Sequence, residues 1–202
     1  MEQGDAILFF NEYRHKVSNG FFRWFTKAGE GISYLGFILY FLFVRYRYSL
    51  LVILAGFLAT VVSFLLKWIF QHPRPAIYFR DAGSFDQIIT IDGVHLLSGY
   101  MSFPSGHTTS AFVLFGLLAF LFARKWYWNV ALFIIALLIG ISRIYLVQHF
   151  LKDVYAGAIT GTLLAMFIYW FNSKLPDGEG YWFNRSIRRN TTSPKNPPQS
   201  EI

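Results

Sequence analysis

Three short polar segments carry residue types that can act together on an anion. They are Lys67-x6-Arg74-Pro75, Pro104-Ser105-Gly106-His107 and Ser142-Arg143-x5-His149-x3-Asp153. Together they supply two imidazoles, one carboxylate and three cations. An imidazole can be a nucleophile or a general acid, and Lys and Arg together suit a phosphate, whose charge is spread over several oxygens. The set therefore favours nucleophilic displacement at a bound phosphate-like group.

The spacing within the segments adds to this interpretation. Ser105, Gly106 and His107 open an apolar stretch, so we expect a helix N-terminus whose free N–H groups and dipole attract an anion. His149 and Asp153 are four residues apart. In a helix they would share one face, and the carboxylate would hold one ring nitrogen while the other stayed free as a base or nucleophile.

The first segment is expected to bend back on itself. Pro73 and Pro75 force the residues before them out of helical geometry, so Arg74 can face the same point as Lys67. Taken singly, an interfacial Lys or Arg simply snorkels to the membrane surface. Isolated histidines (His15, His72, His95) are interpreted as interfacial polar anchors. It is the spacing of the whole set that favours a site.

Composition indicates an integral membrane protein. The 202 residues are 54% hydrophobic and 14% charged, whereas soluble domains carry about 25% charged residues. The length suits one domain of several helices. Cysteine is absent, which excludes disulfides, thiolate metal sites and a Cys nucleophile. We interpret the net charge of +7 by membrane orientation and an anionic ligand, not by nucleic acid. No cleaved signal peptide is expected.

The predicted fold class is all-α: an integral membrane helical bundle with five transmembrane helices and an N-terminal interfacial amphipathic helix. Residues 1–30 would form the interfacial part, because charges interrupt the apolar pattern of 5–28. Residues 31–172 would form the transmembrane core, and 173–202 a basic, cytoplasmic and partly disordered tail. The five apolar stretches, each long enough to span a bilayer, cover about 31–47, 48–70, 105–123, 126–143 and 152–172.

Alternation of span direction would bring the three motifs to one membrane face. That face and the opposite one carry nine cations each, but three on the motif face belong to the motifs, which leaves six against nine. The positive-inside rule then predicts a site facing the exterior or periplasm in a cell (inner) membrane, with the C-terminal tail in the cytoplasm.

In this order, the motifs resemble the three-part signature of the type-2 phosphatidic acid phosphatase superfamily, and the resemblance covers roughly residues 30–172. It implies a metal-independent phosphatase without cofactors. His149 would be the nucleophile that forms a phosphohistidine, Asp153 would orient it, and His107 would be the acid for the leaving group. The phosphoryl oxygens would be bound by Lys67, Arg74, Ser105, Gly106 and Arg143. The chain also offers no carboxylate pair or His cluster typical of a two-metal centre.

The resemblance leaves the substrate open. The compact five-span plan is similar to bacterial undecaprenyl diphosphate phosphatases, with phosphatidylglycerophosphate, phosphatidate and lipid A 1-phosphate as alternatives. A vanadate-dependent haloperoxidase shares the anion pocket by family resemblance, but those enzymes are soluble. A non-enzymatic transporter or lipid-binding protein would not need both histidines and the aspartate. The expected partners are a lipid phosphate and membrane lipids, with no nucleic acid and the oligomeric state open.

The connection from His72 to Phe103 is about thirty residues long and is expected to be irregular. Long irregular loops are uncommon unless they are functional. Its apolar pairs suggest that it packs over the membrane surface as a lid near the site.

Overall fold

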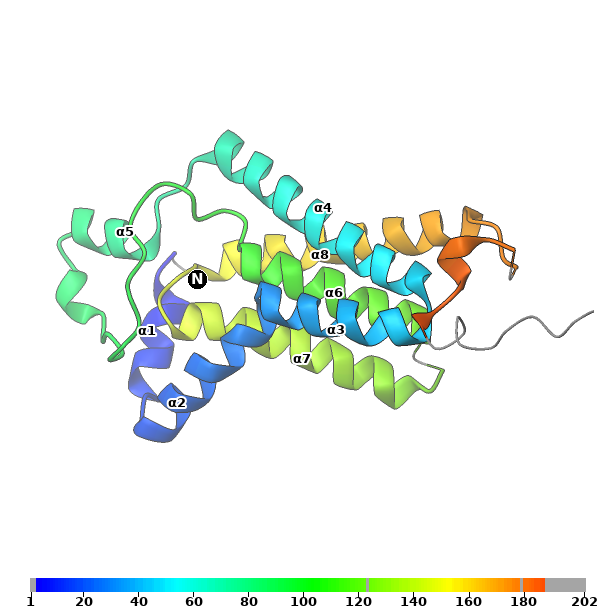
Figure 1. Cartoon of the computed structure of the whole chain (residues 1–202). Helices are drawn as coiled ribbons and strands as arrows, with labels where there is room; N and C mark the ends of the chain where they lie inside the picture. Colours follow the sequence, from blue (N-terminus) through cyan, green and yellow to red (C-terminus); the bar gives the residue numbers. More distant parts are fainter. Residues whose placement is uncertain (1–2, 123, 179, 188–202) are drawn as a thin grey trace, which may run out of the picture.

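The computed structural model describes residues 3–122, 124–178 and 180–187, and within them every regular element is a helix (Figure 1). The α-helices are α1 (Asp5–Glu12), α2 (Lys16–Phe25), α3 (Gly31–Val44), α4 (Tyr46–Phe70), α5 (Pro75–Asp81), α6 (Gly106–Phe122), α7 (Trp126–Tyr145) and α8 (Leu151–Lys174). Short 3-10 turns are η1 (Thr26–Gly29), η2 (Phe85–Gln87) and η3 (Trp182–Asn184). The all-helical expectation is confirmed for these residues.

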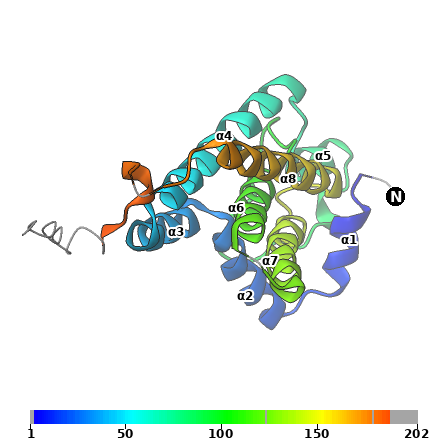
Figure 2. The same ribbon diagram turned by 90° about the vertical axis from the view of Figure 1, so that its right-hand side faces the viewer.

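Helix α6 lies at the centre of the bundle. Figure 2 shows it among α3, α4, α7 and α8, and it packs most extensively against α8, α7 and α4. Its sequence is apolar on all sides, as is typical of a helix that is buried all round. Val113, Leu114 and Leu117 have no exposed surface. The N-terminus of α6, with Ser105 and His107, is therefore held among the other helices.

Two glycines of α8 allow it to pack closely against α6. A Cβ atom on Gly157 would lie 2.8 Å from the carbonyl oxygen of Ser105, and one on Gly161 would lie 2.6 Å from that of Thr109. Small residues at such positions let helix backbones approach each other. The contact fixes the first half of α8 against the first half of α6, where two of the three motifs lie.

Arg47 joins the helices at the opposite end of the bundle. Its side chain is almost fully buried. Nε donates to Oδ1 of Asn172 at 2.6 Å, and Nη1 lies 2.7 Å from the Asp177 carboxylate. This cation, which entered the charge count for membrane orientation, is paired inside the protein.

The first part of the C-terminal segment packs against the bundle. The Tyr46 amide donates to the carbonyl of Arg185 at 2.9 Å, and Asn184 and Ser186 are buried. The predicted polar tail from residue 173 therefore begins as ordered structure, because α8 runs to Lys174 and the carbonyl of Arg185, just after η3, caps the start of α4. The end of the predicted tail, 188–202, lies outside the described residues.

The prediction of five spans is not confirmed by the length and composition of the described helices. Three helical runs in the described part are long and apolar enough to cross a membrane: Tyr46–Asp81, Trp126–Tyr145 and Leu151–Lys174. A fourth is formed if the pair Lys16–Gly29 and Gly31–Val44, bent by 52°, counts as one broken span. Helix α6 has 17 residues, about 25 Å at 1.5 Å per residue. Because protein surrounds α6, the lipid does not dictate its length.

The N-terminal region forms two helices in place of the single predicted interfacial helix. Helix α1 ends at Glu12, and α2 starts after His15, whose ring accepts a hydrogen bond from the Ser18 amide and so caps the new helix. Arg14, in the break, donates to the carbonyl of Tyr145 at 2.6 Å. One of the charges expected to keep this region at the interface, Arg14, thus anchors it to α7.

The connection between α4 and α6 is more ordered than expected. It contains α5 and η2, and its ends are held together by hydrogen bonds from the Arg74 amide to Gly99 and from the Ser102 amide to His72. Phe79 and Ile88 join a buried cluster with Ile7 of α1. That cluster includes the residues around the α7–α8 connection, so this segment supports the chain that carries His149.

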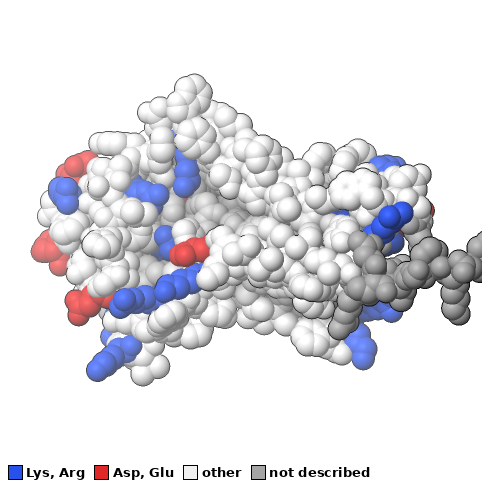
Figure 3. Space-filling model, in the orientation of Figure 1, with Lys and Arg blue, Asp and Glu red and all other residues white. Residues whose placement is uncertain are grey.

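The surface separates charged ends from an uncharged middle. In Figure 3 the basic and acidic side chains gather at the two ends of the molecule, and the band between them is free of charge on this face. Large apolar side chains are exposed along the helices, among them Trp68, Trp126, Trp128 and Trp170. Such a band with aromatic residues near its edges is typical of a membrane protein.

The glycine contact predicts a stability difference between two matched variants. Gly161→Ala should lower the free energy of unfolding by about 1–3 kcal/mol, because the new methyl group overpacks the α6–α8 interface. Gly36→Ala should be neutral or slightly stabilising, because nothing lies within 4 Å of its Cβ position and Ala is the better helix former. Thermal unfolding in detergent measures both, and equal melting temperatures would contradict the packing argument.

Candidate active site

The connection between α7 and α8 holds His149 in a tight turn. The amides of Gln148 and His149 both donate to the carbonyl oxygen of Arg143, at 2.9 and 3.2 Å. Val147 adopts a left-handed conformation with φ of 57°, which is rare for a β-branched residue and is a mark of strain at functional sites. The turn therefore fixes the positions of Arg143 and His149 relative to each other.

His149 and Asp153 are in contact, although not as two residues of one helix. His149 precedes α8, which starts at Leu151, and Asp153 lies in the first turn. The distance from Nδ1 of His149 to Oδ2 of Asp153 is 3.4 Å. Both side chains are almost fully buried. Burial, opposed by the Asp153 hydrogen bond, lowers the pKa of His149 to about 4. The ring is therefore neutral at pH 7, and its Nε2 is not taken by the carboxylate.

The Asp153 carboxylate has two further donors. The hydroxyl of Ser102 donates to Oδ2 at 2.5 Å, and the Phe150 amide donates to the same oxygen at 3.0 Å. The hydrogen bond from the Phe150 amide to the Asp153 side chain fixes the start of α8, as in a capping box. The Ser102 bond joins α8 to the segment before α6. Asp153 is thus held from two sides while it faces His149.

The second motif is attached to the third through the backbone. The amide of Ser105 donates to the carbonyl of Asp153 at 2.9 Å. Ser105 is fully buried, and its hydroxyl accepts a hydrogen bond from Thr108 at 2.9 Å. Helix α6 starts at the next residue, Gly106. The structure therefore brings the helix N-terminus and the His149–Asp153 pair together.

The three cations of the motifs come from three different elements. Lys67 lies in the last turn of α4, Arg74 precedes α5, and Arg143 lies in the last turn of α7. They lie near enough for the charges of Arg74 and Arg143 to act on Lys67. Arg143 is 6% exposed and donates from Nη1 to the hydroxyl of Thr26 at 2.8 Å, whereas its buried Nε has no hydrogen-bond partner. Unpaired N–H donors in a cluster of positive charges are suited to bind a multivalent anion.

His107 lies apart from the buried pair, at the mouth of the site. Its Nε2 is 3.4 Å from Oε1 of Glu30, and both side chains are partly exposed. Glu30 comes from the junction of η1 and α3. The two histidines therefore have different environments: His149 is buried beside an aspartate, and His107 is accessible beside a glutamate.

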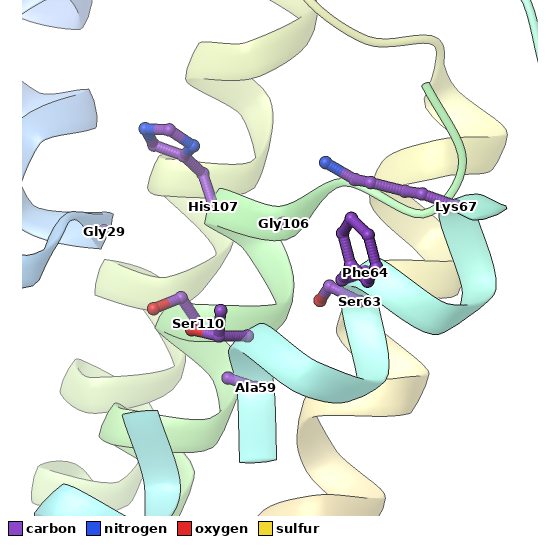
Figure 4. Close-up of a pocket in the computed structure, with 9 residues that line it drawn as sticks. Gly29, Ala59, Ser63, Phe64, Lys67, Gly106, His107 and Ser110 are labelled. Atoms are coloured by element: carbon purple, nitrogen blue, oxygen red, sulfur yellow. The ribbon is translucent and has the colours of Figure 1, made fainter. Parts of the chain in front are cut away.

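A pocket opens on the His107 side of the site. Its volume is about 320 Å³, and its lining includes Lys67, Gly106, His107, Ser63 and Ser110. Figure 4 shows the Lys67 ammonium and the His107 ring at one end of the pocket, with the serines one level further along α4 and α6. In Figure 3 the surface is hollowed beside the charged end, with basic side chains at its rim.

Four residues of this arrangement were not found by sequence reasoning. They are Thr26 beside Arg143, Glu30 beside His107, Ser102 beside Asp153, and Gln148, whose backbone carbonyl accepts from Arg74 Nη1 at 3.2 Å. Gln148 adjoins His149 in the chain. For the others the sequence offers weak signals, because Ser and Thr are common at helix ends, and Glu30 is one of several charges in the N-terminal region.

The geometry defines a class of protein: a helical membrane protein with a basic, histidine-containing site at one end of the bundle. The family model described as "PAP2 superfamily" matches residues 46–177. The chain therefore belongs to the PAP2 superfamily, and the resemblance seen in the sequence is confirmed.

Individual relatives agree with this assignment. The bacitracin transport permease protein BcrC of Bacillus licheniformis is 34% identical over 146 residues, which are 70% of this chain and 65% of that protein. The chain thus spans less than two thirds of the length of this relative.

Two solved structures are similar over most of both chains. The crystal structure of LpxE from Aquifex aeolicus has a TM-score of 0.66 and 31% identity, covering 82% of this chain and 93% of that one. A transmembrane PAP2-type phosphatidylglycerolphosphate phosphatase from Bacillus subtilis also has a TM-score of 0.66, with 25% identity, covering 85% and 87%.

The cation cluster predicts anion-dependent stability. Orthovanadate should raise the melting temperature of the purified protein, because a ligand that binds the folded state stabilises it by mass action. Arg143→Gln should remove most of this shift. Arg45→Gln, at the other end of the bundle, should keep it. Equal shifts in the three proteins would show that the anion binds elsewhere.

Proposed function

We propose that this protein is a membrane lipid phosphate or diphosphate phosphohydrolase that works through a phosphohistidine on His149. The observation that supports the proposal is the His149–Asp153 pair at the start of α8, with Arg143 hydrogen-bonded to the same turn and the N-terminus of α6 beside it. A nucleophile, a group that orients it, and cations for the phosphoryl oxygens are the parts that displacement at phosphorus requires.

The proposed first step divides the work between the two histidines. Nε2 of neutral His149 attacks phosphorus, and the Asp153 carboxylate stabilises the ring as it becomes positive. The bond from phosphorus to the lipid oxygen breaks, and His107 gives its proton to that oxygen. Glu30, 3.4 Å from His107 Nε2, can accept a hydrogen bond from the protonated ring. Water then attacks the phosphohistidine and gives a proton to His107, the bond from phosphorus to Nε2 breaks, and phosphate leaves with both histidines restored.

The charge on the transferred group is met by Lys67, Arg74 and Arg143, with Ser105 and the backbone at Gly106 completing the phosphate site. Arg and Lys directed at the place where charge develops stabilise the transition state electrostatically. In this proposal, the cations take the part that metal ions play in two-metal phosphatases. The mechanism is therefore metal-independent.

For the lipid we propose undecaprenyl diphosphate as the first substrate to test. Phosphatidylglycerophosphate is the second candidate, favoured by the similarity to the Bacillus subtilis phosphatidylglycerolphosphate phosphatase. Phosphatidate and lipid A 1-phosphate are further alternatives. An active site at the mouth of apolar helices favours long-chain substrates, since each buried methylene contributes about 0.8 kcal/mol.

A transporter is the competing class, and the name of the relative BcrC refers to bacitracin transport. The buried aspartate–histidine pair favours catalysis, because a binding site gains nothing from a neutral imidazole oriented toward the anion. A haloperoxidase is disfavoured by the uncharged surface band and the exposed tryptophans.

Phosphate release from a panel of purified lipid phosphates tests the function. We expect turnover of the long-chain substrates in excess EDTA, and inhibition by orthovanadate, which resembles the pentacoordinate transition state. Activity that is lost with EDTA and restored by magnesium or zinc would refute the metal-independent mechanism. If wild-type protein releases no phosphate from any lipid, the phosphatase proposal is wrong.

The roles of the histidines predict different substrate dependence. His149→Ala should abolish turnover and prevent a covalent phosphoenzyme. His107→Ala should lose activity on an alkyl lipid phosphate, whose leaving oxygen needs a proton, but keep measurable activity on an activated aryl phosphate. Asp153→Asn should keep the fold and lower kcat. Trapping the phosphoenzyme with labelled phosphate and mapping the labelled peptide identifies the phosphorylated histidine. A label on His107 would reverse the assignment of the two roles.

We also propose that the site faces the exterior and that the opposite end of the bundle faces the cytoplasm. In this cysteine-free chain, a single cysteine at Asp86, an exposed residue in η2, should react with an impermeant thiol reagent in intact cells. A cysteine at Lys125, exposed before α7, should react only after lysis. The reverse pattern would overturn the orientation and leave the chemistry untouched.

A further inference from the structure

The pocket beside His107 contains a buried hydroxyl that the proposed mechanism does not use. Ser63 is 5% exposed and lies in the wall of this pocket, and its Oγ has no hydrogen-bond partner. Serine and threonine hydroxyls in apolar helices are normally satisfied, as that of Thr60 is by the carbonyl of Gly56 at 2.8 Å. A buried hydroxyl without a hydrogen-bond partner lowers the stability of the folded protein unless a ligand forms that hydrogen bond.

The pocket lies on the leaving-group side of the site. Its lining includes Lys67, Gly106 and His107 but neither His149 nor Asp153. In an in-line displacement, the nucleophile and the leaving oxygen are on opposite sides of phosphorus. A leaving oxygen that receives its proton from His107 therefore carries the rest of the lipid into this pocket.

The hydroxyls lie one helical turn beyond the phosphate site. Ser63 precedes Lys67 by four residues on α4, and Ser110 follows His107 by three on α6. Each step is about one turn, or about 5 Å along the axis. Figure 4 shows the Ser63 oxygen between α4 and α6 at this level, whereas the Ser110 oxygen points away from Ser63. A substrate oxygen that lies one or two atoms beyond the bridging oxygen would be close enough to accept a hydrogen bond at the level of Ser63.

Beyond the hydroxyls the lining becomes apolar. A second pocket, of about 310 Å³, shares Thr60 and Ser110 with the first and continues between α3 and α4 along Ile38, Val52 and Phe57. Along α4 the pocket therefore presents first the Lys67 ammonium, then the Ser63 hydroxyl, and then an apolar wall. A lipid phosphate whose leaving group starts with an oxygen-bearing unit and continues as a hydrocarbon chain matches this order.

We propose that this pocket is a leaving-group subsite in which Ser63 donates a hydrogen bond to an oxygen of the leaving group. The ligand chemistry is an oxygen acceptor close to the bridging oxygen, supplied either by the second phosphate of a lipid diphosphate or by a glycerol-type carbon–oxygen unit. A prenyl monophosphate lacks such an atom. The inference rests on the proposed phosphatase function and makes Ser63 a specificity-determining residue for it.

The test compares substrates that share one hydrocarbon chain. For Ser63→Ala, kcat/KM on farnesyl diphosphate should fall about tenfold or more, as expected for losing a hydrogen bond to a charged acceptor. Activity on farnesyl monophosphate should stay within about twofold. Ser63→Thr, which keeps a hydroxyl, should retain the preference. Ser49→Ala is the matched control, because it is buried in the same helix at the far end and its hydroxyl is already bonded to Ile38.

A third substrate, phosphatidylglycerophosphate, separates the two sources of the acceptor. A loss confined to the diphosphate identifies the second phosphate as the acceptor, and a loss confined to the glycerol lipid identifies the carbon–oxygen unit; either supports the subsite. An equal loss on all three substrates, or none, overturns it. Absence of phosphate release by the wild-type protein would instead refute the phosphatase function itself.

Discussion

The site depends on the interactions of one residue, Asp153, at the first turn of α8. Its carboxylate faces Nδ1 of His149 and accepts hydrogen bonds from Ser102 and the Phe150 amide, while its backbone carbonyl accepts from the amide of Ser105. One residue therefore ties together the α7–α8 turn, the segment before α6 and the start of α6. The side-chain contacts are all made by Oδ2, whereas Oδ1 is buried without a hydrogen-bond partner. Together with the backbone bond to Ser105, they set the positions of the second and third motifs relative to each other.

The sequence predicted which residues meet, but not how they are held. The three motifs were found because their residue types are costly near a membrane unless they act together, and alternating helix direction placed them at one end. Ser102 and Glu30 were missed because their roles depend on tertiary contacts between segments 51 and 77 residues apart. His149 and Asp153 do meet, but not within one helix, since the chain makes a left-handed turn at Val147 and starts α8 only at Leu151.

The sequence predicted the long apolar helices better than the N-terminal region, where contacts with the rest of the protein decide the structure. The apolar stretches at 48–70, 126–143 and 152–172 correspond to α4, α7 and α8, whose lengths suit a bilayer. The predicted stretch 105–123 also corresponds to α6 (Gly106–Phe122). The N-terminal region was predicted less well: it breaks into α1 and α2, and Arg14 in the break donates to the carbonyl of Tyr145. The break between α1 and α2 depends on a tertiary contact of Arg14, so it could not be predicted from hydropathy or composition.

The electrostatics of the site carry a cost that the proposed function explains. Lys67, Arg74 and Arg143 lie close enough for their like charges to act on one another, and Asp153 supplies one negative charge against the three. Uncompensated buried charge lowers stability. A phosphoryl group would relieve the repulsion when it binds, and most fully in a transition state whose equatorial oxygens carry the charge. The fold would thus maintain unfavourable electrostatics in the free protein, which binding of the reacting group removes.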